Sequence, residues 1–418
     1  MDILDELKWR GLFSQSTNEK LLSSLLSVGS VAYYCGFDPT APSLHHGNLV
    51  QLILMRHLQN AGHRPICLIG GATGLIGDPR LTGERTLNDA QTVHQWSERL
   101  AAQLKHFLRT TDGPNGVIIE NNYSWLSKLS ALDFLRDVGK HFRLGTMLAK
   151  DTVASRLSGS GLSFTEFSYQ ILQAYDFNML HDKYGAMLQT GGQDQWGNLT
   201  SGLDYIHKMS GDKVHVLTTP LITKVDGTKF GKSEGGAIWL DPNMMGVYEF
   251  YQFWLNVADE EVVKLLKVFT FLSVEEISAL EEQVQQVPEK RDAQRKLAEE
   301  VTKFVHGREA FVQAVEASDA LFGRGSIEKI DEATIIAAIS GLETSEANLG
   351  DKISEQFVNT KLSASFNDYR KTLSAGGVYV NNKKVESLDR AIENTDILNG
   401  QVVLLRKGKK NIAAVRIT

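Results

Sequence analysis

The sequence predicts an α/β protein: a doubly wound parallel sheet in the N-terminal part, then an all-helical domain, and a small α+β domain at the C-terminus. Three observations support this division. Short apolar runs alternate with segments of helical periodicity through the first part of the chain. Residues 245–322 show helical periodicity throughout. Residues 352–418 combine helical spacing with short strands.

Composition and length indicate a globular protein with several domains. The chain has 418 residues, which suits two or three domains of about 150 residues each. With 42% hydrophobic and 22% charged residues, no extensive disorder is implied. No apolar run approaches the roughly 18 residues of a membrane span, and the acidic start is unlike a signal peptide. We therefore expect a cytoplasmic protein without a membrane segment.

The first predicted unit is a strand, a loop, a helix and a second strand. The apolar run at residues 31–37 predicts a buried strand, residues 47–60 have helical spacing, and residues 65–69 form the next apolar run. Gly71, Gly74 and Gly77 follow, spaced by threes. This spacing fits neither a Walker loop nor the dinucleotide fingerprint G-x-G-x-x-G, which argues against a dinucleotide-dependent oxidoreductase.

The loop between this first strand and its helix has the composition of an anion site. It holds His45, His46, Gly47 and Asn48 where unpaired backbone N–H groups and the positive end of the helix dipole meet. Imidazole and amide groups can donate hydrogen bonds to phosphate oxygens, and the glycine lets an anion approach the backbone. Taken alone, two histidines of this kind would more often be ordinary loop residues.

Further elements repeat this arrangement along the chain. We expect a helix at residues 87–108, a strand at 117–121, and helices at 134–142 and 146–157. In the next helix, Tyr169, Gln173 and Asp176 are spaced i, i+4, i+7 and share one face.

Two more strands end in polar loops. Residues 186–190 lead into a glycine-rich loop, residues 191–198, and a helix. Residues 214–218 precede the loop at residues 226–233, whose Lys229 and Lys232 can reach an anion. These lysines alone could also be solvated surface charges.

The predicted domain boundaries follow the changes in pattern. We expect a catalytic domain at residues 1–244, an all-helical domain at 245–322, a linker at 323–351 and a C-terminal RNA-binding domain at 352–418. That last segment holds twelve lysines and arginines against six acidic residues, whereas the whole chain has a net charge of −6. A basic module on an acidic body indicates an RNA partner.

Several separated motifs together resemble one family. Residues 43–48 resemble the His-Ile-Gly-His signature of class I aminoacyl-tRNA synthetases, and Lys229 to Ser233 resemble their Lys-Met-Ser-Lys-Ser loop. With four further stretches in the same order, the chain closely resembles bacterial-type tyrosyl-tRNA synthetases over essentially its whole length. The four stretches are Tyr33 to Thr40, Gly74 to Pro79, Ser168 to Asp176 and Gly192 to Asn198.

The resemblance implies a fold, an activity and site residues. The catalytic domain would be Rossmann-like, and it would activate L-tyrosine with ATP and pass it to tRNA(Tyr). The residues that would bind tyrosine are Tyr34, Asp78, Tyr169, Gln173, Asp176 and Gln195. The residues that would line the ATP site are Gly36, Asp38, Thr40, His45, Gly47, Gly192, Asp194 and Lys232. Catalysis would rest on His45, Asn48, Lys229, Lys232 and Ser233.

The resemblance also implies the partners. ATP would be a co-substrate, Mg²⁺ would be bound through the nucleotide, and the enzyme would be a homodimer. We expect no metal held by the protein, because Cys35 and Cys67 are far apart in strands and the histidines lack ligand spacing. The two cysteines also make no disulfide framework.

Two departures from the family pattern leave an alternative open. The final histidine of the signature is Asn48, which can donate a hydrogen bond but cannot become cationic. The methionine and first serine of the lysine loop are Phe230 and Gly231. A synthetase-derived RNA-binding protein without catalysis would explain both departures.

The tryptophan-specific sister enzyme is disfavoured by Tyr34 and Asp176, because an indole has no hydroxyl group to pair with them.

Overall fold

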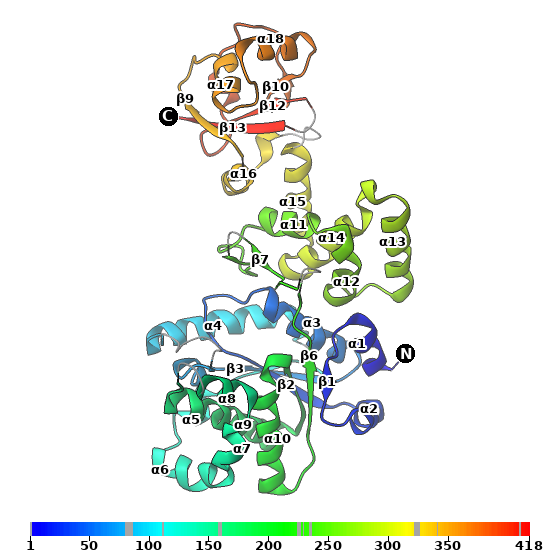
Figure 1. Cartoon of the computed structure of the whole chain (residues 1–418), viewed down its shortest axis with the longest axis vertical. Coiled ribbons are helices and arrows are strands. Elements are labelled where there is room, and N and C mark those ends of the chain that lie inside the picture. Colours follow the sequence, from blue (N-terminus) through cyan, green and yellow to red (C-terminus); the bar gives the residue numbers. More distant parts are fainter. Residues whose placement is uncertain are drawn as a thin grey trace. The chain divides into compact units, whose positions relative to one another are not determined.

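We describe a computed structural model of the chain (Figure 1). It describes residues 2–79, 87–110, 113–157, 161–223, 227–228, 230–233, 236–321, 327–340, 342–408 and 411–418. The chain divides into two compact units: Met1–Leu240 with Ala258–Ala293, and Asp241–Val257 with Gln294–Thr418. None of the helices in the described part combines the length and the hydropathy that a bilayer span requires.

The first unit contains a six-stranded sheet in the order β1-β6-β5-β2-β3-β4. All neighbours are parallel except β1, which pairs antiparallel with β6. The strands are β1 (Gln15–Ser16), β2 (Ala32–Phe37), β3 (Arg64–Ile69), β4 (Ile118–Asn121), β5 (Ala186–Gly192) and β6 (His215–Thr219). The strand order reverses at β2, between β3 and β5, which is where ligands bind in open sheets of this kind. The predicted doubly wound parallel sheet is confirmed.

Helices cover both faces of this sheet (Figure 1). Helices α3 (His46–Asn60) and α4 (Ala90–Phe107) cover one face, and α9 (Phe164–Tyr184) and α10 (Trp196–Ser210) cover the other. The alternation of strand side chains explains why both faces are apolar. Tyr34 of β2 packs on Phe177 of α9, with ring centroids 5.0 Å apart, whereas its neighbour Tyr33 donates a hydrogen bond to the Met55 carbonyl of α3.

The remaining elements of the first unit are short or peripheral. They are α1 (Ile3–Arg10), α2 (Glu19–Val28), α5 (Tyr123–Leu126), α6 (Ala131–Asp133), α7 (Leu144–Leu148), α8 (Asp151–Leu157), β7 (Lys232–Ser233), β8 (Gly236–Ala237), α12 (Asp259–Phe269) and α13 (Val274–Gln286). Helices α12 and α13 belong to this unit, whereas the sequence predicts them in a separate all-helical domain. One reason why α12 and α13 join the first unit is Arg10 of α1. Its buried guanidinium donates hydrogen bonds to the carbonyls of Thr270 (3.1 Å) and Leu272 (2.9 Å), between the two helices.

The second unit begins with helices α11 (Val247–Leu255), α14 (Asp292–His306) and α15 (Arg308–Leu321), as the helical periodicity predicts. A five-stranded sheet follows in the order β11-β10-β12-β13-β9. Its strands are β9 (Thr344–Ala347), β10 (Val378–Val380), β11 (Lys383–Lys384), β12 (Val402–Lys407) and β13 (Asn411–Ile417). Strand β9 pairs parallel with β13, and the other pairs are antiparallel.

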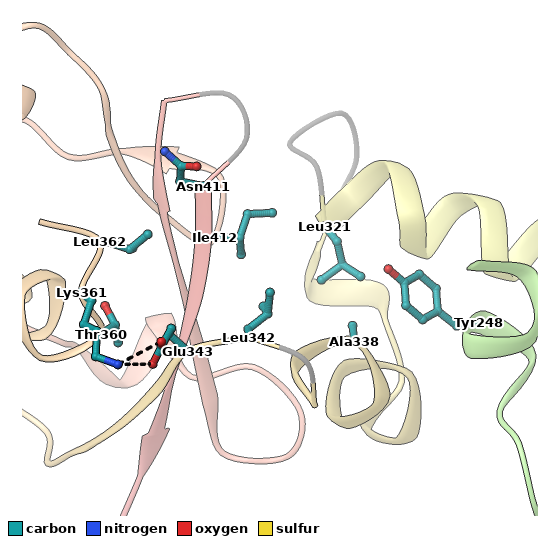
Figure 2. A pocket seen from close by; sticks show the side chains of 10 residues that line it. All are labelled: Tyr248, Leu321, Ala338, Leu342, Glu343, Thr360, Lys361, Leu362, Asn411 and Ile412. Atoms are coloured by element: carbon teal, nitrogen blue, oxygen red, sulfur yellow. Dashed lines mark hydrogen bonds and ion pairs between the residues drawn. The ribbon is translucent and has the colours of Figure 1, made fainter. Parts of the chain in front are cut away.

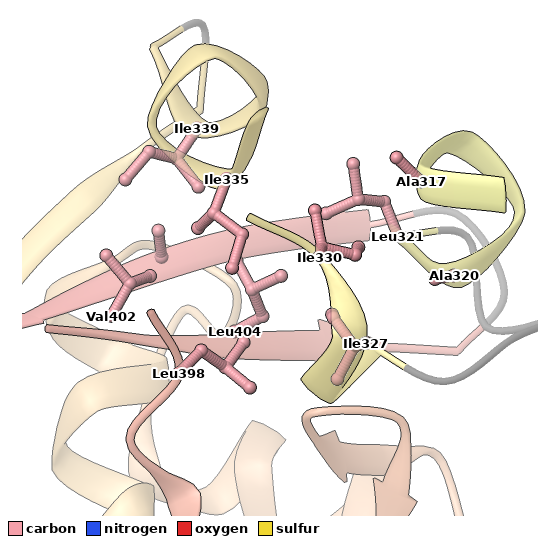
Figure 3. Packing of buried hydrophobic residues seen from close by; sticks show 11 residues of the cluster. Ala317, Ala320, Leu321, Ile327, Ile330, Ile335, Ile339, Leu398, Val402 and Leu404 are labelled. Atoms are coloured by element: carbon pink, nitrogen blue, oxygen red, sulfur yellow. The ribbon is translucent and has the colours of Figure 1, made fainter. Parts of the chain in front are cut away.

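The segment expected as a linker is part of this C-terminal sheet domain. Within its described part, residues 323–351 hold α16 (Glu332–Ile339) and the edge strand β9. Ile335 and Ile339, one helical turn apart, pack against Val402 and Leu404 of β12 (Figure 3). The alternate residues of β12 face the other side, where α17 (Ile353–Asn359) and α18 (Phe366–Ser374) contribute Phe357 and Tyr369. Because Ile335 and Ile339 are buried in the core, and Ala347 of β9 is buried on the other side of the sheet, this segment is part of the folded domain.

Candidate active site

A cavity of about 220 Å³ lies at the carboxyl ends of β2 and β5. It stands at the point where the strand order reverses, as expected for an open parallel sheet. Most of the residues singled out from the sequence line it. They are Tyr34, Gly36, Asp38, Thr40, Asn48, Asp78, Tyr169, Gln173, Asp176, Gly192 and Gln195. The fold therefore brings together side chains from five separate stretches of the sequence.

The other predicted site residues do not line this cavity or cannot be placed. His45 and Gly47 lie at the start of α3, and Asp194 lies exposed in the turn before α10. Lys229 lies outside the described residues. Lys232 and Ser233 form β7 with their backbone, and their side chains are outside the described part.

Asp176 is a buried residue of the cavity lining, and two donors hold its carboxylate. Trp125 Nε1 donates to its Oδ1 at 2.7 Å, and Asn122 Nδ2 donates to its Oδ2 at 2.9 Å. Burial raises the pKa of Asp176 to about 7, against the lowering effect of these two hydrogen bonds. Asn122 directly follows β4 and Trp125 lies in the short helix α5 after it, so this segment fixes the position of the carboxylate.

Tyr34 adds an unpaired hydroxyl group to the cavity lining, close enough to Asp176 to be affected by its charge. Its side chain is 1% exposed, and the hydroxyl has no hydrogen-bond partner in the structure. Burial, and after it the charge of Asp176, raises the pKa of Tyr34 well above its ordinary value, so it stays a neutral donor. A buried hydroxyl without a partner costs free energy unless a ligand supplies one.

A second carboxylate, Asp38, lines the cavity directly after the end of β2. It accepts hydrogen bonds from the Tyr169 hydroxyl (2.7 Å) and from Thr73 Oγ1 (2.7 Å). Gly70 permits this arrangement, because a Cβ at that position would lie 1.7 Å from Asp38 Oδ1. Thr73 also accepts from Asn122 Nδ2 at 3.0 Å, which connects Asp38 to the residues around Asp176.

A third carboxylate, Asp78, is bound to the turn that begins α10. Gln195 Nε2 donates to its Oδ2 at 2.9 Å and Asn198 Nδ2 donates to its Oδ1 at 2.8 Å. Gln173 adds a buried carbonyl oxygen, Oε1, that has no hydrogen-bond partner. The described lining residues include three aspartates and no lysine or arginine. Such a cavity favours a ligand that carries a positive group.

His45 and Asn48 act together as the N-terminal cap of α3. Asn48 Oδ1 accepts from the His45 backbone N–H at 3.1 Å, and His45 Nδ1 accepts from the Gly47 N–H at 3.0 Å. Since Nδ1 is an acceptor, the neutral ring carries its proton on Nε2, which remains free to donate to a ligand. Burial lowers the pKa of His45, which favours this neutral form.

The loop at residues 43–48 lies against Gly231 of the lysine loop and against residues 238–240, which follow that loop. The His46 N–H donates to the Ile238 carbonyl at 2.9 Å, and the Leu240 N–H donates to the Leu44 carbonyl at 2.9 Å. The His46 ring is also packed on Gly231, where a Cβ would come within 2.3 Å of it. Two motifs about 190 residues apart in sequence therefore form one structure.

This packing explains the two unusual residues of the lysine loop. Gly231 has a φ of +79°, in the left-handed region, so both its backbone and the His46 ring exclude a side chain. Phe230 is buried and its ring meets His46 edge-on at 6.3 Å. Burial lowers the pKa of His46 to about 4, so it is an uncharged packing partner at neutral pH.

Comparisons with known proteins agree with this geometry. A family model described as "tRNA synthetases class I (W and Y)" matches residues 27–323, and one described as "Tyrosine--tRNA ligase SYY-like C-terminal domain" matches residues 334–415. A relative named "Tyrosine--tRNA ligase", from Streptomyces coelicolor, is 53% identical over 419 residues, which is 100% of this chain and 99% of the relative.

A solved structure extends the similarity to the fold. The C-terminally truncated mitochondrial tyrosyl-tRNA synthetase of Aspergillus nidulans is 32% identical with a TM-score of 0.69, covering 77% of this chain and 94% of that one. The chain belongs to the bacterial-type tyrosyl-tRNA synthetases of class I. This membership confirms the activity that the resemblance implied, ATP-dependent ligation of tyrosine to tRNA.

Sequence reasoning missed several residues of the synthetase site. Asn122 and Trp125 hold Asp176, Thr73 holds Asp38, and Asn198 holds Asp78. A signal for Asn122 was present, because it follows the predicted strand at residues 117–121 at the ligand-binding edge of the sheet. Trp125 had no such signal, since its polar contact depends on α9, which lies far along the chain.

The synthetase also has a larger cavity, of about 600 Å³, in its second unit (Figure 2). Leu321, Leu342 and Ile412 line it, and the ion pair of Lys361 with Glu343 (3.0 Å) lies at one side. None of the residues singled out from the sequence borders it.

Within the described residues, no group of three or more histidines, cysteines and acids gathers that could hold a metal ion.

Proposed function

We propose that this synthetase binds tyrosine in the cavity at β2 and β5, with the phenol at Tyr34 and Asp176. The observation that carries this proposal is the unpaired Tyr34 hydroxyl beside a carboxylate that two donors hold in place. A phenol hydroxyl can accept from Tyr34 and donate to Asp176. Phenylalanine would leave both groups buried without a partner, which favours tyrosine. Rejection of phenylalanine by this means is already known for the tyrosyl-tRNA synthetase family.

The opposite end of the amino acid would be held by the remaining polar groups. Asp78 and the free Oε1 of Gln173 suit the ammonium group, and Gln195 can turn its amide toward the carboxylate. Tyr169 would contribute through its hydroxyl, which now donates to Asp38. The ammonium and carboxylate groups are common to all amino acids. The side chains that bind them therefore provide affinity and orientation and leave selectivity to Tyr34 and Asp176.

The first reaction needs no protein nucleophile. A carboxylate oxygen of tyrosine attacks the α-phosphorus of ATP, a new oxygen–phosphorus bond forms, and pyrophosphate leaves with the electrons of the broken bond. Catalysis then rests on orientation and on stabilisation of the charge that develops on the phosphate. His45 Nε2 and the Asn48 amide can donate there, and Lys229 and Lys232 would add positive charge. Mg²⁺ would arrive bound to ATP.

The second reaction transfers tyrosine from the adenylate to the terminal ribose of tRNA(Tyr). We infer that the C-terminal domain contributes to tRNA binding through its excess of lysine and arginine. The enzyme would act in the cytoplasm, where its tRNA is used.

We further propose that the enzyme is a homodimer. The segment from residue 131 to residue 164 leaves large apolar side chains exposed, although part of it packs on a core around Met147 and Ile171. The exposed residues are Leu132, Leu135, Leu144, Leu148, Leu157 and Phe164. A monomer would leave this apolar surface in water, and a second copy would bury it.

Charging of purified tRNA(Tyr) with labelled tyrosine tests the two-step function. We expect tyrosyl-tRNA to form only when ATP, tyrosine and tRNA are all present. The alternative of an RNA-binding protein without catalysis predicts tRNA binding with neither adenylate nor charged tRNA, and that result would overturn the proposal.

A further inference from the structure

Lys150 connects the segment between α7 and α8 to the first turn of α10. Its ammonium group donates hydrogen bonds to the Gly197 carbonyl and to Ser201 Oγ. Ser201 Oγ donates in turn to the same carbonyl, at 3.1 Å. The side chain crosses the helix at Gly197, where a Cβ would be in ordinary van der Waals contact with Lys150 Cδ, at 3.4 Å.

Lys150 is half-buried, with its ammonium group directed at the buried Ser201. Burial lowers the pKa of Lys150 to about 8, although the charge of Asp204 acts in the opposite direction. Ser201 is 5% exposed, so the acceptor side of the contact is buried. A partly buried ammonium group that loses its hydrogen-bond acceptors costs free energy. The side chain of Lys150 is therefore held in this one position.

The turn that Lys150 contacts is the turn that holds Asp78. Gln195 and Asn198 lie on either side of Gly197 and donate to the two oxygens of the Asp78 carboxylate. Gln195 and Asp78 both line the cavity at β2 and β5. A displacement of the Gly197 carbonyl would therefore move the groups proposed to bind the ammonium and carboxylate of the substrate.

We propose that Lys150 is a positioning residue for amino-acid activation, which fixes the first turn of α10 and through it Gln195, Asn198 and Asp78. The inference rests on the proposed function of this cavity. The proposal has a specific consequence, because Gln195 and Asp78 would bind the ammonium and carboxylate groups, which all amino acids share. Loss of Lys150 should weaken activation of tyrosine and of phenylalanine by the same factor.

The test is pyrophosphate exchange by Lys150→Met, expressed per active site after titration of the sites by adenylate formation. We expect kcat/KM for tyrosine to fall by about tenfold, as for the loss of a hydrogen bond to a charged group, with the ratio of tyrosine to phenylalanine unchanged. Lys208→Met is the matched control. Lys208 lies at the other end of α10 and donates to the His141 carbonyl at 2.7 Å, so exchange should stay at the wild-type level.

A rescue experiment separates positioning from a general effect on folding. In Lys150→Cys, treatment with 2-bromoethylamine converts the new thiol into a thioether analogue of lysine. The native Cys35 and Cys67 are buried and their pKa values are raised by burial, so they should react slowly. We expect the treatment to restore most of the lost kcat/KM. Ser201→Ala should add little further loss in the Lys150→Met background.

The outcomes distinguish this inference from the proposed function. The inference is overturned if Lys150→Met keeps its kcat/KM per site, if it changes the tyrosine to phenylalanine ratio, or if it lowers only the number of active sites or the melting temperature. Wild-type protein that shows no exchange would overturn the proposed function and this inference with it.

Discussion

Trp125 donates a 2.7 Å hydrogen bond from its indole nitrogen to Asp176, and both side chains are buried. The contact joins the turn after β4 to helix α9 and fixes one oxygen of the carboxylate, while Asn122 fixes the other. The part of the site proposed to select the substrate is therefore positioned by a residue that does not line the cavity.

Trp125→Phe removes this donor and keeps an aromatic ring at the position. Hydrogen bonds to charged groups contribute about 1.5–3 kcal/mol, so we expect kcat/KM for tyrosine to fall by about 10- to 100-fold. Phenylalanine makes no bond to Asp176, so its exchange should fall less. Trp9→Phe is the control, because Trp9 lies in α1, away from the cavity. Equal losses for both amino acids would argue against a role for Trp125 in holding Asp176.

Tyr34→Phe removes the unpaired buried hydroxyl. We expect the free energy of unfolding to rise by about 1 kcal/mol, because an unsatisfied polar group is lost, while the preference for tyrosine over phenylalanine falls by about tenfold. Urea denaturation and pyrophosphate exchange measure the two effects. Tyr33→Phe is a matched control on the opposite face of β2, where it removes a hydrogen bond to Met55 and should destabilise the protein without changing selectivity.

Asp176 should make the stability of the enzyme depend on pH. Its pKa is about 7 in the folded protein and near 3.8 in the unfolded chain, so the folded state binds more protons between these values. Stability from this group is therefore lost as pH rises from about 4 to 7, by up to about 4 kcal/mol, and is constant above.

Comparison with Asp176→Asn isolates the contribution of this one group. The variant should gain stability relative to wild type as pH rises from about 4 to 7 in urea denaturation. Asp204→Asn, at an exposed position on α10, should show no such trend. A constant difference between wild type and Asp176→Asn across this range would mean that the carboxyl is not perturbed.

Gly231→Ser brings the lysine loop closer to the usual family sequence, and we expect it to lower activity. The left-handed φ of +79° opposes a side chain, and so does the His46 ring, which would lie 2.3 Å from a Cβ at this position. Strain of about 1–3 kcal/mol would reduce the rate of exchange by about 5- to 100-fold. The loss should be smaller in a His46→Ala background. Exchange equal to or faster than wild type would refute this explanation of the glycine.

Leu144→Glu tests the proposed dimer surface. A charge placed in an apolar interface disfavours association, so we expect the native mass in solution to fall from that of a dimer to that of a monomer. Val28→Glu is the control, because Val28 is 88% exposed but lies in α2, away from this surface. A monomeric wild-type protein, or a Leu144→Glu variant that remains dimeric, would contradict the proposal.

Local patterns predicted most of the sheet and most of the cavity. The run at residues 31–37 became β2 (Ala32–Phe37), and the helix expected at residues 87–108 became α4 (Ala90–Phe107), since burial on a strand or helix leaves a direct periodic signal. The i, i+4, i+7 spacing brought Tyr169, Gln173 and Asp176 to the same cavity.

Features that depend on distant contacts could not be predicted in this way. The sequence around Ile335 looks like a linker until β12 is folded beside it, and α12 joins the first unit through contacts with Arg10. The broken helical segment at residues 131–148 is another case, because a local pattern does not show where tertiary packing interrupts a helix.

The most direct test of the central claim is pyrophosphate exchange with tyrosine, phenylalanine and tryptophan offered separately to the wild-type enzyme. This assay measures the cavity at β2 and β5 without tRNA. Pairing of a phenol with Tyr34 and Asp176 predicts rapid exchange with tyrosine and little or none with the other two. Exchange with tryptophan, equal exchange with phenylalanine, or no exchange at all would contradict it.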